Sequence, residues 1–257
     1  MKPTLTATTI LIGTLFLPGP LCGAPAGEIY FNDFNGPPGS VYPEWTSSPI
    51  TYTSATNPPG SGVLPPQVVS NTDATNGTQR FLGEFGGPRI GQPGDPGYNR
   101  TRVDQTISLT LTNLPAHSDL RLTFDLLVLK SWDGNSPMYG PDRWTLSVVG
   151  GPVLLDTTFS NNHKVSKEGS DQNYPQLKAM PRTGAARTNS LGYKFFGDSR
   201  YPLAFTFSHS ASTLKLDFHS SLFEGKGTAD ESWGLDNVRL VIAPAESPAV
   251  PEMNAKN

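Results

Sequence analysis

The chain has 257 residues with a formal net charge of −3, so it lacks the basic surface that nucleic acids or anionic membranes attract. Hydrophobic residues make up 36% of the sequence, enough to bury one large core. The 26 glycines and 25 prolines are more than long helices tolerate, and no segment has a helical period. We therefore predict an all-β protein without nucleic-acid partners.

The first 26 residues have the three-part pattern of a secretory signal peptide. Lys2 precedes an apolar run at residues 10–17, and Ala24 and Ala26 are the small residues that signal peptidase reads. We expect cleavage after Ala26. The apolar run is too short for a permanent anchor, so we expect a secreted, extracellular protein with no membrane anchor in its mature chain. Cys22 is the only cysteine and leaves with the signal peptide, so the mature chain must fold without disulfides.

We predict that residues 27–243 form a single domain and that the Pro- and Ala-rich residues 244–257 form a disordered tail. The first strand begins at Glu28. Between there and residue 102 we expect long Gly- and Pro-rich loops with a short strand at 79–86. Apolar and polar residues then alternate over 103–112 and again over 120–128, which is typical of half-buried strands. A short polar turn separates the two, and we interpret them as an antiparallel hairpin.

The second half of the chain repeats this organisation. Strands are predicted over 142–149 and 153–159, and residues 160–200 are predicted to form long loops packed on the sandwich. Alternating segments at 203–207 and 214–218 suggest a second hairpin, and the closing strand is predicted over 238–242. About ten short strands of this kind predict an antiparallel β-sandwich of two sheets, in a jelly-roll or immunoglobulin-like form.

Two acidic stretches, at residues 230–237 and 132–142, place carboxylates beside glycines, which allow the tight turns of a cation-binding loop. Calcium takes about 6 to 8 oxygen ligands, mainly from carboxylates, amides and carbonyls. We therefore predict a structural calcium site, and whether the two stretches share one ion stays open. The alternative is a pair of ordinary acidic turns. The candidate ligands, with Asp236 and Asp33 ranked first because they flank the terminal strands, are Asp33, Asp133, Asp142, Glu231, Asp236 and Asn237.

Three stretches carry a resemblance to a known family: Asp33-Phe34, residues 131–135 with 140–142, and residues 231–238. They resemble signature stretches of secreted bacterial jelly-roll domains, which occur in exosortase-sorted surface proteins of the PEP-CTERM type. Those domains are similar in architecture to carbohydrate-binding modules and MAM domains. The resemblance covers about residues 28–243 and implies a jelly-roll fold. Residues 248–257 depart from the family because they have neither an apolar anchor nor a terminal basic cluster.

These features favour a non-catalytic binding module for a carbohydrate or cell surface. Sugars bind to aromatic faces, and the candidate aromatic residues in predicted loops are Trp45, Tyr98, Tyr139 and Tyr174. A structural or adhesive extracellular protein without a small ligand explains the same features. A glycoside hydrolase or lyase is the third possibility, but no spacing selects a catalytic pair of carboxylates. The sequence leaves the ligand and the oligomeric state open.

Overall fold

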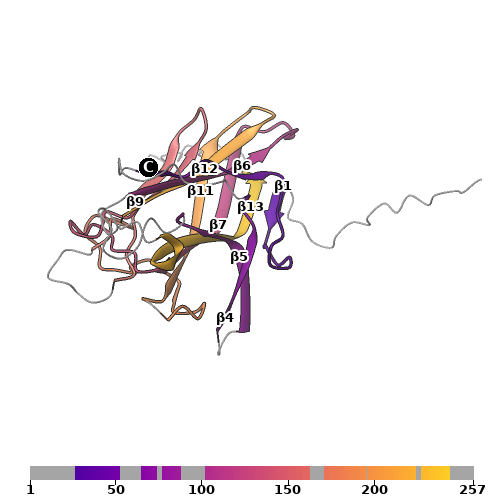
Figure 1. Ribbon diagram of the computed structural model, residues 1–257. Coiled ribbons are helices and arrows are strands. Elements are labelled where there is room, and N and C mark those ends of the chain that lie inside the picture. Colours follow the sequence, from indigo (N-terminus) through magenta and orange to yellow (C-terminus); the bar gives the residue numbers. More distant parts are fainter. Residues whose placement is uncertain are drawn as a thin grey trace, which may run out of the picture.

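The computed structural model describes residues 27–52, 65–73, 77–87, 102–162, 171–194, 196–223 and 227–243. Within these residues the chain forms two antiparallel sheets that face each other, so the predicted β-sandwich is confirmed (Figure 1). The predicted signal peptide, the predicted tail and Tyr98 lie outside the described residues. The jelly-roll form stays a prediction.

One sheet has seven strands in the described chain, in the order β10-β11-β7-β13-β5-β4, with β1 also beside β13. Phe31 lies opposite Arg239, so the first and last strands are neighbours in this sheet. The strands are β1 (Glu28–Asn32), β4 (Val68–Asp73), β5 (Gly77–Phe85), β7 (Asp119–Lys130), β10 (Arg187–Thr188), β11 (Asp198–Ser208) and β13 (Glu231–Ile242).

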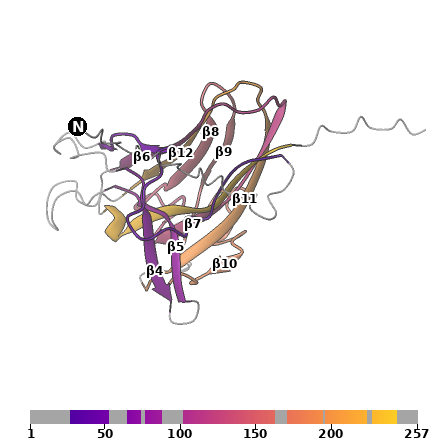
Figure 2. The ribbon, with the colours of Figure 1, turned by 90° about the vertical axis from the view of Figure 1, so that its right-hand side faces the viewer.

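The other sheet has the order β2-β6-β12-β8-β9, with β3 also beside β6. Figure 2 shows its strands as a layer above the first sheet. They are β2 (Trp45–Ser47), β3 (Thr51–Tyr52), β6 (Val103–Leu111), β8 (Arg143–Val148), β9 (Val153–Thr158) and β12 (Leu214–Leu222). A single 3₁₀ turn, η1 (Gly227–Ala229), precedes β13. No helix among the described residues is long and apolar enough to cross a membrane.

The core fills the space between the two sheets. The alternating segments supply much of it: Ile107, Leu109, Leu122, Phe124, Leu126, Leu216 and Phe218 are all buried, and Phe205 is partly buried. All four tryptophans, Trp45, Trp132, Trp144 and Trp233, are also buried. Each buried aromatic side chain removes on the order of 150–250 Å² from water, so these rings contribute a large share of the stabilisation of a domain without disulfides.

Both predicted hairpins in the alternating segments are wrong. The strands β6 and β7 lie in different sheets, and so do β11 and β12. In each case the short turn crosses from one sheet to the other. A hydrogen bond of 2.9 Å from the Leu114 N–H to the Ser212 carbonyl oxygen joins the two crossing loops. Alternation shows which face of a strand is buried. The pattern is the same whether the next strand pairs with it in the same sheet or lies in the other sheet.

The predicted acidic loop before the last strand is also wrong, because β13 already begins at Glu231. Glu231, Trp233 and Leu235 alternate along the strand and are all buried. Gly234 makes no turn. A Cβ atom at this position would lie 2.5 Å from Cδ2 of Phe81, so the glycine provides the space in which that ring packs on β13. The strand β11 also begins earlier than predicted, at Asp198, inside the region that we predicted to form loops.

Candidate functional site

Three carboxylates converge at one end of the sandwich. Asp133 follows β7, Asp142 directly precedes β8, and Glu231 is the first residue of β13. One carboxylate oxygen from each residue lies within 4.8 Å of the other two. The residues are only 6%, 0% and 3% exposed, respectively. This acidic triad therefore combines side chains from both sheets and is enclosed by protein.

The pleat of the strands directs two of these acids inward. Asp142 lies two residues before Trp144, and Glu231 lies two residues before Trp233. Residues separated by two positions on a strand point to the same face, so each carboxylate points the same way as a core tryptophan. The rings of Trp144 and Trp233 meet edge to face with centroids 5.9 Å apart. An acid two residues before a tryptophan, found at the beginning of β8 and of β13, is a signal that the sequence-based prediction did not use.

Hydrogen bonds fix the loops that carry the triad. The Asp133 N–H donates to the Asp142 carboxylate, and the Asn162 amide donates to Oδ1 of Asp133 at 2.7 Å. The Phe223 N–H donates to Oδ1 of Asp142 at 3.2 Å. In turn, the Asp142 N–H donates to the Gly134 carbonyl oxygen at 2.8 Å, which closes the 134–142 loop. Two backbone donors thus orient the Asp142 carboxylate, and a side-chain amide orients the Asp133 carboxylate.

The spacing of the triad has an electrostatic consequence. Two unit charges 4.8 Å apart repel by about 3.5 kcal/mol at an effective dielectric constant of about 20. The arrangement therefore favours the uptake of a cation or of protons. Calcium ligands stand at about 2.3–2.6 Å from the ion, so two of them lie at most about 5 Å apart, and the triad meets that limit. Its all-oxygen donor set is that of a hard cation and differs from the sulfur and imidazole donors typical of zinc and copper sites.

The other three predicted ligands lie away from the triad. Asp236 is opposite Asp125 of β7, on the outer face of the seven-stranded sheet. The side-chain amide of Asn237 donates to Oδ2 of Asp125 at 2.8 Å. Asp33 accepts hydrogen bonds from the backbone and side-chain N–H groups of Asn35, at 3.2 and 2.8 Å. The predicted ligand set therefore separates into two groups, and the two residues ranked first are not in the triad.

Asp236 has an unusual proton affinity. Its burial raises the pKa of its carboxyl group to about 7, and the charges of Asp125 and Asp33 act in the same direction. A hydrogen bond from the Asn237 N–H and the charge of Arg200 oppose the increase in this pKa only in part. Arg200 also forms an ion pair of 2.5 Å with Asp125. The outer face thus carries a carboxyl group that changes its charge near neutral pH.

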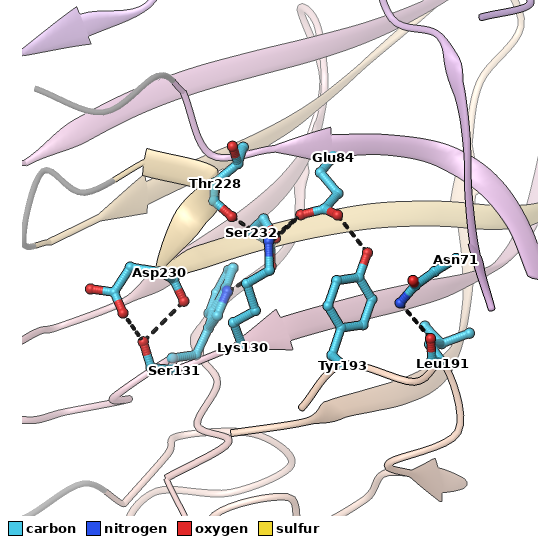
Figure 3. A network of polar contacts seen from close by, with 10 residues as sticks. Asn71, Glu84, Lys130, Ser131, Leu191, Tyr193, Thr228, Asp230 and Ser232 are labelled. Carbon is cyan, nitrogen blue, oxygen red and sulfur yellow. Dashed lines mark hydrogen bonds and ion pairs between the residues drawn. The ribbon is translucent and has the colours of Figure 1, made fainter. Parts of the chain in front are cut away.

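Beside the triad, a polar network fastens residues 190–194 to the outer face of the sheet (Figure 3). Glu84 accepts from the Lys130 ammonium at 2.5 Å, from the Ser232 hydroxyl at 2.7 Å and from the Tyr193 hydroxyl at 2.6 Å. Burial, followed by the charge of Glu84, raises the pKa of Tyr193, so this hydroxyl stays a donor at physiological pH. Because these groups bond to one another inside the protein, the network is structural.

The predicted aromatic ligand residues have different environments. Trp45 begins β2 instead of lying in a loop, is 2% exposed, and donates from its indole to the Tyr30 hydroxyl at 2.8 Å. Tyr174 packs against Phe159 with ring centroids 5.0 Å apart. Tyr139 is 37% exposed in the 134–142 loop. Of the predicted aromatics that the structure describes, Tyr139 is the most exposed and Tyr174 is partly buried.

No protein-family model matches this chain, and no curated protein matches it either. The likeness to secreted jelly-roll domains therefore rests on the three sequence stretches alone.

Proposed function

We propose that this protein is an exported, non-catalytic β-sandwich binding module for a carbohydrate or cell-surface glycan, with a structural calcium ion at the acidic triad. The observation that carries the calcium site is the convergence of three buried carboxylates within 4.8 Å. Up to six oxygens come from these groups, which is the lower end of the coordination number that calcium takes. The signal-peptide pattern of residues 1–26 supports export.

The burial of the triad supports a structural role for the ion. Asp133, Asp142 and Glu231 are at most 6% exposed, so a polysaccharide cannot reach an ion between them. A calcium ion here joins the start of β8 in one sheet to β7 and β13 in the other. In a domain without disulfides, such a link stabilises the native state because the unfolded chain does not present the three carboxylates together.

Thermal unfolding with calcium and with a chelator tests this site. An ion that binds only the native state adds about 2.7 kcal/mol at a calcium concentration of 100 times its dissociation constant. For a domain of this size we expect an increase in melting temperature of roughly 5–10 °C. Glu231→Gln keeps the shape of the side chain and removes one charge, and it should abolish most of that increase.

Asp236→Asn is the matched control, because it makes the same chemical change at a carboxylate outside the triad. This variant should keep the full response to calcium. Equal melting temperatures of the wild-type protein in calcium and in chelator would refute the site. Loss of the response in Asp236→Asn alone would move the ion to the outer face.

The binding function is tested on a glycan array with the purified mature chain. Retention of one class of glycan supports a binding module, whereas the absence of any retained glycan favours the structural or adhesive alternative. One observation favours an enzyme: Asp125 and Asp236 lie directly opposite each other in the β7–β13 pair, and a glycosidase needs two neighbouring carboxyl groups. Asp125, however, is 5% exposed and bonded to Arg200 and Asn237. Release of reducing ends from oligosaccharides, lost in Asp236→Asn, would establish catalysis.

A further inference from the structure

A small pocket lies on the outer face of the seven-stranded sheet, where β5, β7, β10, β11 and β13 contribute side chains. Figure 2 shows β10 and β11 along the edge of this layer. Three arginines, Arg80, Arg187 and Arg200, line the pocket together with the apolar residues Phe81 and Leu127, which we describe as its floor. Both floor residues are buried. The pocket is separate from the acidic triad, which faces the core.

The arginines are arranged in an unfavourable way for a protein without a ligand. Arg187 and Arg200 lie directly opposite each other in the β10–β11 pair. Like charges at directly opposed positions destabilise a sheet. Arg200 has Asp125 as an ion-pair partner, and Arg80 donates to the Asn35 carbonyl oxygen at 2.7 Å. Arg187 is exposed and makes no ion pair or hydrogen bond with the residues that the structure describes. Within the described part of the chain, its charge is therefore left for an anion.

We propose that this pocket binds the carboxylate group of a uronic acid unit in an acidic glycan. The glycan rests on the proposed binding function, whereas the preference for a carboxylate rests on the pocket alone.

Shape and size favour a carboxylate over larger groups. The pocket encloses about 30 Å³, and a bound water needs about 10–15 Å³ of such space. It therefore holds two or three water-sized atoms, which suits a planar carboxylate and excludes a sugar ring. The ring must then lie outside, across the exposed Arg80 and Arg187 side chains. Guanidinium groups bind carboxylates through two parallel hydrogen bonds, and the apolar floor strengthens that attraction by excluding water.

Asp236 on the pocket wall makes binding dependent on pH. The charged groups around it are Asp125 on β7, Arg200 on β11, Asp33 after β1 and Arg80 on β5. Its pKa is raised to about 7, so below neutral pH it is uncharged and can donate a hydrogen bond to a bound carboxylate. Above that pH it is an anion and repels the ligand. The affinity for carboxylates should therefore fall between pH 6 and pH 8.

Calorimetric titration of the full mature chain tests the proposal with three probes: oligogalacturonate, its fully methyl-esterified form, and acetate. We expect oligogalacturonate to bind and the ester, which has the same sugar backbone without the charge, to bind at least about tenfold more weakly, since a charge-assisted hydrogen bond is lost. Acetate should compete with oligogalacturonate. Arg187→Ala should lower the affinity for oligogalacturonate at least about tenfold, because it too removes a charge-assisted hydrogen bond.

Arg121→Ala is the matched control. Arg121 is an exposed arginine on the same face of β7, six residues before Leu127 and hence roughly 20 Å along the strand. This variant should bind like the wild-type protein. Asp236→Asn should bind oligogalacturonate with equal affinity at pH 6 and pH 8, a readout that a purely structural role of the pocket does not produce.

The outcomes separate this proposal from the broader one. Equal binding of the ester and the acid, or unchanged binding in Arg187→Ala, overturns the carboxylate pocket even if the protein binds glycans. Binding of acetate that Arg187→Ala abolishes, with no binding of any glycan, overturns the uronic acid ligand and the glycan-binding function together. Binding of oligogalacturonate that requires Arg187 and the free acid supports both.

Discussion

The contact between Gly234 and the ring of Phe81 gives a sharp test of how the outer face of the sheet is packed. In a Gly234→Ala variant the new Cβ would lie 2.5 and 2.8 Å from two carbon atoms of that ring and 3.0 Å from the Leu82 carbonyl oxygen. Ordinary contacts of this kind are about 3.5–4.0 Å. The ring must therefore move by about 1 Å. It cannot do so freely, because it is 0% exposed and packs with Leu127, Leu129 and Leu191.

The expected cost follows from two opposing effects. Overpacking a filled site costs about 1–3 kcal/mol, and the backbone oxygen of Leu82 leaves little room for relaxation. Replacing a glycine by alanine within a strand contributes about 0.5–1 kcal/mol in the other direction, because it lowers the entropy of the unfolded chain. We expect the free energy of unfolding to fall by roughly 2 kcal/mol in Gly234→Ala.

Urea denaturation of a double-mutant cycle isolates the contact. Phe81→Ala alone should cost about 3–5 kcal/mol, since it opens a cavity at a fully buried position. In that background Gly234→Ala should have an effect of less than about 0.5 kcal/mol, because the atom that it would collide with is absent. Equal effects of Gly234→Ala with and without the Phe81 ring would show that the glycine serves the backbone and that the packing argument is wrong.

Two further predictions concern pH. Because folding raises the pKa of Asp236 from its ordinary 3.8 to about 7, the native state holds this proton more tightly, and stability is lost as pH rises from about 4 to 7. The free energy of unfolding of Asp236→Asn, relative to that of the wild-type protein, should therefore increase over that interval by at most about 4 kcal/mol. Urea denaturation at pH 5 and pH 8 measures this. An equal shift of the urea midpoint between the two pH values in both proteins would contradict the prediction. His209 contacts His117 at 2.7 Å, and burial, together with the charge of that neighbour, lowers the pKa of His209. Stability should therefore fall as pH decreases through about 6.5, the ordinary histidine value, and His209→Gln should reduce this loss in thermal unfolding between pH 7.5 and 5.5.

The strands could be predicted from the sequence because alternation records burial on one face of each strand. The long segments now seen as β6, β7 and β12 were all identified in this way, and their apolar residues are buried. Their partners could not be predicted, because the same pattern fits a hairpin and a crossing between sheets. Turn length was misleading here, since a short turn joins β6 to β7 across the sandwich.

The composition of the acidic stretch marked its carboxylates as candidates, but it could not show which of them lie close together. Read as a loop, residues 230–237 place no constraint on the direction of each side chain. Read as a strand, they do, because Glu231 and Asp236 are separated by five positions and an odd separation puts two residues on opposite faces. Glu231 shares the inner face with Trp233, and Asp236 lies opposite Asp125 on the outer face. The ranking of Asp236 above Glu231 as a partner of Asp133 and Asp142 thus followed from a misplaced strand boundary.

This odd separation also explains how one short stretch contributes to two different chemical environments. On the inner side, Glu231 is held among other carboxylates and away from solvent, at the place proposed for an enclosed ion. On the outer side, Asp236 lies on the wall of a pocket with Arg80, Arg187 and Arg200, where a ligand in solution has access. The two carboxylates lie on opposite faces of the same strand, so the sheet itself separates their charges. A substitution in one group should therefore leave the other group's binding intact, which makes Glu231→Gln and Asp236→Asn controls for each other.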